Sequence, residues 1–165
     1  MSFSLDDMVD WLRDNDVNQF SKIIKEERAY KGHSILMMIG MHSDGTYMVK
    51  ELLKRFPKEI DRKSQEPLEQ FAGDIGLIAD TDIIRDSGYT ALMLSVMFGP
   101  PASVKAFLDA GADMDCKTDH GSSVLEFAQY RDDAQIRCLF EIKSTNESPE
   151  TGAVCNCENN KCVII

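Results

Sequence analysis

The sequence has little of several residue types that define large classes of proteins. It contains one Trp, five Pro and ten Gly among 165 residues, which is too little Pro and Gly for a fibrous or low-complexity chain. Its apolar runs are all shorter than the stretch of about 18 residues that a membrane-spanning helix needs. The acidic beginning, MSFSLDDMVDW, lacks the basic and apolar regions of a secretory signal, so we expect no such signal.

Basic residues are also scarce. Lys and Arg number 18 against 28 Asp and Glu, which gives a net charge of −10. Binding of nucleic acid through a broad basic face needs clustered Lys and Arg, so this balance argues against a nucleic-acid partner. The five Cys form an odd count in a chain without a visible secretory signal, and we expect reduced thiols in the cytosol.

The composition divides the chain into two parts. Residues 1–143 alternate apolar, periodic runs with short turns, and the 43% hydrophobic content of the chain is enough for a core. Residues 144–165 begin with a stretch rich in Ser, Thr, Glu and Pro, which cannot bury enough surface to order itself. We therefore expect one domain over 1–143 and a flexible tail over 144–165.

The apolar residues of the domain follow a helical period. Leu5, Met8, Val9 and Leu12 lie at i, i+3, i+4 and i+7, on one face of a helix that Ser4 can cap. A second helix is expected at 17–24, and further pairs at 34–41 with 47–56, 91–98 with 102–110, and 124–130 with 133–140. No helix is long enough to be stable alone, so the pairs must stack on one another.

The helix pairs recur at a fixed distance. The segments GYTALMLSV, from Gly88, and GSSVLEFAQ, from Gly121, are 33 residues apart, and GHSILMMIG, from Gly32, starts in the same way. Such a period is the sequence sign of a stacked solenoid. We predict that Gly88 and Gly121 occupy equivalent turns, and that Leu92 and Leu125 are both buried.

The residues D-S-G-Y-T-A-L-M, followed by V-K-A-F-L-D-A-G-A-D-M-D, resemble an ankyrin repeat, a 33-residue unit with a T-P-L-H helix start and a G-A-D turn. The resemblance covers 85–117 and 118–141, part of 30–56, and a capping repeat at 4–27. Ala91 departs from the family pattern by replacing Pro, and Met93 and Glu126 stand where His is common. The resemblance implies an all-α, ankyrin-repeat solenoid of stacked antiparallel helix pairs.

The segment 57–85 fits this pattern poorly. Ser64 can open another repeat, but only 24 residues separate it from Gly88, so the second helix would be truncated. The sequence leaves open whether 57–85 is an irregular, truncated repeat or a loop.

The family binds proteins on a concave face formed by the turns and the first helix of each pair. Carried over by position, the resemblance implies a protein partner at three groups of residues: His33 and Met37; Tyr89, Met93 and Met97; and His120, Ser122, Glu126 and Tyr130. Tyr is enriched among the residues that dominate binding energy, so Tyr89 and Tyr130 are the first candidates.

The last four residues, Cys162-Val163-Ile164-Ile165, form a C-a-a-X motif, which predicts attachment of a prenyl group to Cys162 by a prenyltransferase. The terminal Ile resembles the Leu-type set, which favours geranylgeranyl over farnesyl. One prenyl group gives only reversible membrane attachment, and the acidic tail adds no attraction to an anionic membrane. Cys155 and Cys157 are therefore candidates for palmitoylation, with ordinary exposed thiols as the alternative. A metal site at C-x-C-x4-C lacks a fourth ligand.

These features predict a lipid-anchored protein-interaction module in the cytoplasm, peripheral on membranes, without enzymatic activity, cofactor or metal. The common nucleotide-binding, hydrolase, zinc-protease and calcium-loop motifs are absent. Prenylation is eukaryotic chemistry, so the chain acts either in its own eukaryotic cell or as an effector that a bacterial pathogen delivers into a host. Two alternatives stay open: a small enzyme with its site in 57–85, near Lys58 and Arg62, and a soluble inhibitor or adaptor with an incidental C-terminus.

Overall fold

The computed structural model describes residues 4–27, 29–74 and 81–140. Within these ranges the chain is helical, and its only extended pairings are two isolated bridges, Tyr30 with His33 and Lys117 with Ser123. The helices are α1 Leu5–Arg13, α2 Val17–Lys25, α3 Ile35–Met41, α4 Thr46–Arg55, the 3-10 helix η1 Pro57–Glu59, α5 Glu69–Ala72, α6 Thr81–Arg85, α7 Ala91–Phe98, α8 Pro101–Asp109, α9 Val124–Tyr130 and α10 Ala134–Leu139. The predicted all-α class is confirmed.

Polar side chains at the helix starts fix where the helices begin. The hydroxyl of Ser4 accepts a hydrogen bond from the Asp7 amide at 3.1 Å, and the Asp7 carboxylate accepts one from the Ser4 amide at 2.9 Å. Ser123 and Glu126 form the same reciprocal pair at the start of α9. Such caps satisfy amides that the helix itself leaves unpaired, and each stabilises by about 1 kcal/mol.

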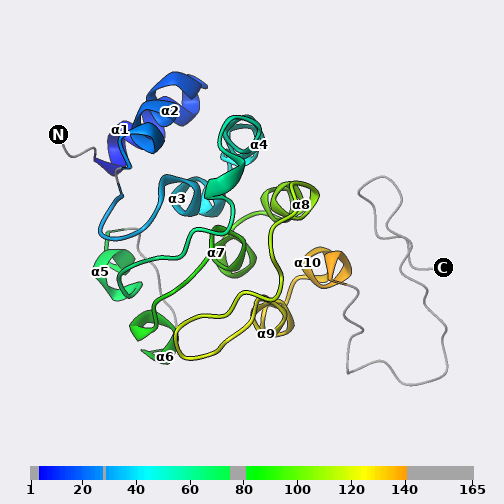
Figure 1. Ribbon diagram of the computed structural model, residues 1–165. Helices are drawn as coiled ribbons and strands as arrows, with labels where there is room; N and C mark the ends of the chain where they lie inside the picture. The colour runs from blue at the N-terminus through cyan, green and yellow to red at the C-terminus, as the bar shows by residue number, and fades with distance from the viewer. Residues whose placement is uncertain (1–3, 28, 75–80, 141–165) are drawn as a thin grey trace, which may run out of the picture.

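The helices pack as antiparallel pairs that stack in two layers (Figure 1). The inner helices are α3, α7 and α9, and the outer helices are α4, α8 and α10. Among the inner helices α3 packs against α7 and α7 against α9, while among the outer helices α4 packs against α8 and α8 against α10. Helices α1 and α2 pack on each other, and α2 also packs against α3 and α4. This is the repeat architecture that the 33-residue period predicts.

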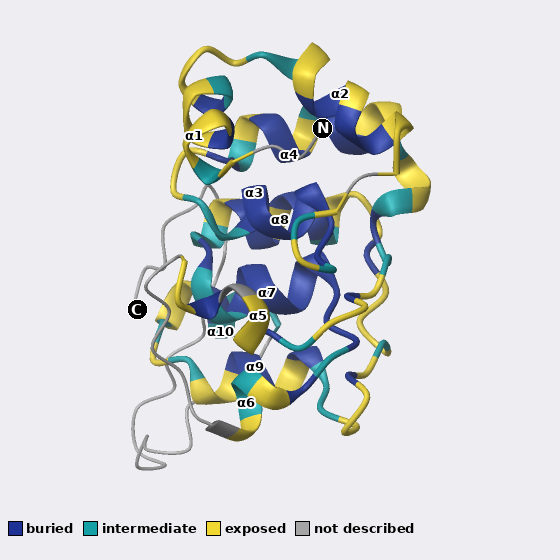
Figure 2. Ribbon diagram, turned by 90° about the vertical axis from the view of Figure 1, so that its left-hand side faces the viewer, coloured by how far each residue is buried: buried dark blue, intermediate teal, exposed yellow. Residues whose placement is uncertain are grey.

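The core runs along the centre of the stack (Figure 2). Every residue of α7 from Ala91 to Val96 is buried, and so is α3 from Ile35 to Gly40. The glycines Gly40 and Gly99 sit where the two repeats approach most closely, since a methyl group at Gly99 would collide with the carbonyl oxygen of Gly40. Direct packing of α3 on α7 therefore depends on backbone-to-backbone approach.

The expectation for the two equivalent leucines is half right. Leu92 is 1% exposed, as predicted, but Leu125 is 43% exposed. Helix α7 lies between α3 and α9, whereas among the described residues α9 has a stacked inner helix on one side alone. Leu125 is therefore exposed because it lies at the end of the stack.

A turn, which we call a finger, precedes each inner helix. Gly32, Gly88 and Gly121 each lie two residues before the helix cap and have φ of +78°, +75° and +93°. Residues that carry a side chain rarely adopt this left-handed backbone conformation, and glycine is therefore favoured at each turn. The predicted equivalence of Gly88 and Gly121 is confirmed.

Hydrogen bonds join Ser64 directly to the finger before α7. In the finger before α9, the Thr118 amide donates to the Ser122 carbonyl at 2.9 Å and the Gly121 amide donates to the Thr118 carbonyl at 3.0 Å. In the finger before α7, Ser64 takes the place of Thr118: its amide donates to the Tyr89 carbonyl at 2.8 Å, and its carbonyl accepts from Gly88 at 3.3 Å.

The chain between these two halves of the finger is an insertion, which carries α5 and α6 on the inner-helix side of the stack (Figure 1). Because α3 and α7 are in direct contact, the insertion adds no helix pair between them. This explains why 57–85 fits the repeat pattern poorly.

Candidate functional site

Four of the residues predicted to contact a partner are buried. His33 and Met37 are 0% exposed, and Tyr89 and Met93 are 1% exposed. The expectation that these side chains line an accessible surface is wrong, because positions at the start of each inner helix pack into the core and against the fingers.

Internal contacts account for two of these buried side chains. The hydroxyl of Tyr89 donates to the carbonyl oxygen of Ile83, in the insertion, at 2.8 Å, and its ring lies 5.9 Å from that of Phe127. Burial raises the pKa of Tyr89 and lowers the pKa of His33, whose Nδ1 lies 2.8 Å from the carbonyl oxygen of Lys31.

The other predicted residues reach the surface in the last two repeats. Tyr130 is 87% exposed, Glu126 and His120 are exposed, and Met97 and Ser122 are half-buried. His120 is held in place by Asp86, a buried residue whose Oδ1 lies 3.0 Å from the imidazole Nδ1 and accepts from the His120 amide at 3.2 Å.

Met97 and Tyr130 belong to a row of equivalent positions. Each lies nine residues after its finger glycine, and Met41 holds the same position in α3. All three are in the last turn of successive inner helices that pack side by side, and all three are at least partly exposed. We call Met41, Met97 and Tyr130 the inner-helix row. The sequence analysis missed Met41, although counting nine residues from Gly32 would have found it.

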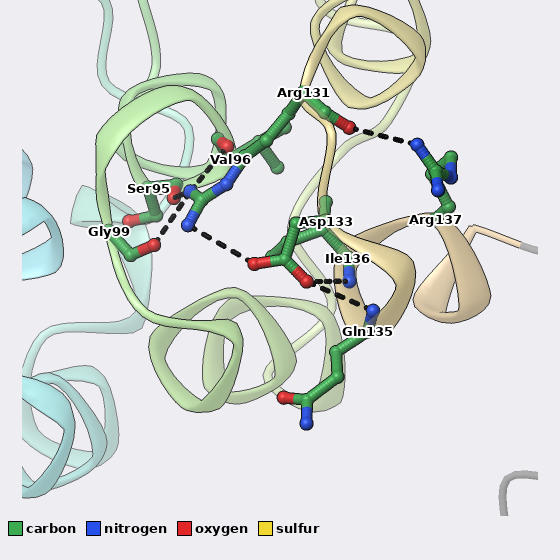
Figure 3. A network of polar contacts seen from close by, with 8 residues as sticks. All are labelled: Ser95, Val96, Gly99, Arg131, Asp133, Gln135, Ile136 and Arg137. Carbon is green, nitrogen blue, oxygen red and sulfur yellow. Dashed lines mark hydrogen bonds and ion pairs between the residues drawn. The ribbon is translucent and has the colours of Figure 1, made fainter. Parts of the chain in front are cut away.

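Arg131, which follows α9, links that helix to the end of α7 (Figure 3). Its guanidinium Nη1 donates to the carbonyl oxygens of Val96 at 2.8 Å and Gly99 at 2.7 Å, with a longer contact of 3.4 Å to Ser95. These are the terminal carbonyls of α7, which a cation stabilises through charge and hydrogen bonding. Because Tyr130 directly precedes Arg131, this contact holds the backbone of Tyr130 near the end of α7.

Asp133 links Arg131 to the start of α10. Its carboxylate lies 3.4 Å from Nη2 of Arg131 and accepts from the amides of Gln135 at 2.9 Å and Ile136 at 3.2 Å. One carboxylate therefore caps α10 and pairs with the arginine that caps α7. The last repeat is fastened to the previous one by charged groups as well as by its core.

Candidate lipid, metal and enzymatic features give fewer structural findings. The predicted lipidation sites Cys155, Cys157 and Cys162 lie outside the described residues. Over the described ranges, no three His, Cys, Asp or Glu side chains are grouped to hold a metal, and no helix is long and apolar enough to cross a membrane. Arg62, near which an enzymatic site was considered, pairs with Glu59 at 3.1 Å.

Two cysteines lie within the described ranges. Cys116 is a free, half-buried thiol whose pKa is raised by burial and by Asp113. Cys138 lies in α10 and is half-buried.

Comparison with known proteins assigns part of the stack to a family. A search of curated proteins found no match. Residues 87–119 match the family model described as "Ankyrin repeat". The matched range begins at the finger before α7, includes the pair α7 and α8, and ends in the finger before α9. Residues 87–119 are therefore similar to one ankyrin repeat, and this part of the stack has the helix pair of such a repeat.

Proposed function

We propose that the protein binds a protein partner through the inner-helix row, with Tyr130 as the main contact. The observation that carries this proposal is the alignment of Met41, Met97 and Tyr130 at one position of three successive inner helices. Aromatic and Met side chains are enriched in protein interfaces, and Tyr is frequent among residues that dominate binding energy. A rigid stack also loses little entropy when it binds.

The partner test compares two exposed tyrosines. Tyr130 is on an inner helix, whereas Tyr47, 53% exposed, is on the outer helix α4 and serves as the matched control. Partners captured by the wild-type chain are compared with those of Tyr130→Ser and Tyr47→Ser, after thermal unfolding shows that both variants are folded. A partner lost with Tyr130→Ser and kept with Tyr47→Ser supports the proposal. Equal capture by all three proteins contradicts it.

We further propose that a lipid anchor tethers this module to a membrane from the cytoplasm. The support is the C-a-a-X motif at 162–165, which requires that Ile165 is the last residue of the chain before processing. Prenylation of Cys162 gives reversible attachment, and palmitoylation of Cys155 or Cys157 adds a second lipid. The transferase is supplied by the protein's own eukaryotic cell or, for a bacterial effector, by the host.

Intact-mass analysis of protein made in a eukaryotic cell tests this anchor. We expect a prenylated Cys162 and loss of Val163–Ile165. Cys162→Ser should leave the protein off membranes, while replacement of Cys155 and Cys157 together should leave it prenylated but spread over internal membranes. An unmodified chain that ends at Ile165 rules the anchor out and leaves the interaction module without it.

A further inference from the structure

Helices α2 and α4 pack together at the N-terminal end of the stack (Figure 1). Side chains from the two helices and their ends line a groove. Its volume is about 690 Å³, within the range of about 300–1,000 Å³ that is usual for ligand sites. It is lined by Asn18, Ser21, Lys22, Lys25 and Glu26 from α2 and its end, and by Arg55 and Phe56 from the end of α4. The groove is formed by different helices from those of the inner-helix row.

The charge of this groove is opposite to that of the protein. Three cations, Lys22, Lys25 and Arg55, line it with a single carboxylate, that of Glu26, although the chain as a whole carries −10. Many basic side chains elsewhere pair with a nearby acid, such as Lys54 with Glu51 and Lys105 with Asp109. The three groove cations form no ion pair with described residues.

The three cations lie at the ends of their helices, and one of them has a side-chain contact. Lys22 and Lys25 lie in the last turn of α2, where the helix dipole attracts positive charge. Arg55 Nη1 lies 3.4 Å from the hydroxyl of the buried Ser21, which directs the guanidinium toward α2. The half-buried ring of Phe56 adds apolar surface beside the charges.

We propose that this groove binds an acidic peptide segment of a partner protein. Carboxylate side chains of the segment pair with Lys22, Lys25 and Arg55, and an apolar side chain packs on Phe56. The groove is shallow and open, and the ring of Phe56 beside the charges offers a peptide side chain an apolar contact. Complementary charge of this kind raises the rate of encounter and makes binding sensitive to salt.

The test uses the unlipidated full-length chain and a labelled peptide, Glu-Leu-Glu-Glu-Leu-Glu, with Gln-Leu-Gln-Gln-Leu-Gln as the uncharged control. The double variant Lys22→Gln, Lys25→Gln removes the groove charges. Lys105→Gln with Lys117→Gln removes the same charge from exposed positions far from the groove. We expect the groove variant to bind the acidic peptide about five- to twentyfold more weakly than the wild type, and the control variant to bind within about twofold.

Four results would overturn the proposal. The acidic peptide fails to bind, the uncharged peptide binds equally well, both double variants weaken binding to the same degree, or vesicles of phosphatidylcholine and phosphatidylserine in equal parts bind better than the peptide. The inner-helix row is untouched by these variants. Their outcome is therefore independent of the Tyr130 experiment.

Discussion

Replacing Arg131 by Met should release the last repeat from the stack. The variant keeps a long apolar stem but loses the hydrogen bonds to the carbonyl oxygens of Val96 and Gly99, at 2.8 and 2.7 Å. Hydrogen bonds to a charged group contribute about 1.5–3 kcal/mol, and the favourable charge at a helix C-terminus about 0.3–1 kcal/mol more. The side chain is 23% exposed, so water repairs part of the loss. We expect a loss of about 2–3 kcal/mol.

Urea denaturation measures this loss, and hydrogen exchange locates it. In a stack whose repeats contact only their neighbours, the amides of α9 and α10 should exchange faster while those of α3 change little. Arg137→Met is the control, because Arg137 makes only a long contact of 3.5 Å to the Arg131 carbonyl and a pair at 3.1 Å with Asp132, whose side chain is 99% exposed, and such a pair contributes about 0–1 kcal/mol. The reasoning is refuted if Arg131→Met unfolds at the same urea concentration as Arg137→Met, or if exchange accelerates evenly along the chain.

Three further outcomes are expected from the same assay. Leu92→Ala should cost about 2–5 kcal/mol and Leu125→Ala clearly less, since the first leaves a cavity and the second starts exposed; equal losses would contradict the assigned end of the stack. Gly99→Ala should cost about 1–3 kcal/mol, because its methyl group forces α7 away from the Gly40 carbonyl; unchanged stability would contradict the close approach. Burial lowers the pKa of His33 below the 6.5 of the unfolded chain, so the unfolded state takes up more protons as the pH falls. The wild type should therefore lose stability as the pH drops from about 6.5 through the folded pKa, and His33→Gln should lose less. If the free energy of unfolding falls equally with pH in the two proteins, His33 does not cause the loss.

Much of the fold could be predicted because the relevant signals are local. A cap such as Ser4 with Asp7 is formed within one turn, and the apolar period that identifies each helix is read within ten residues. The glycine turns recur at the repeat distance, so Gly88 and Gly121 could be equated before any contact was known. Sequence periodicity therefore gave the helix pairs and their stacking order.

The remaining features depend on contacts between distant residues. Tyr89 is covered through its bond to Ile83, and the poor fit of 57–85 to the repeat pattern does not indicate that this contact forms. Leu125 and Leu92 hold equivalent positions, yet their burial differs because only one has neighbours on both sides. Arg131 reaches carbonyls 32 to 36 residues earlier, a contact that has no sequence signature.

The finger that carries the insertion has a use in protein engineering. Its two ends are joined by the hydrogen bonds of Ser64 with Gly88 and Tyr89, so this junction is independent of the length of the loop, although Leu68 and Ile83 of the loop pack on the core. Loop-closure entropy rises only with the logarithm of length, by about 0.6 kcal/mol for each doubling. A foreign epitope can therefore be added within this loop, provided that Leu68 and the contact of Ile83 with Tyr89 are kept.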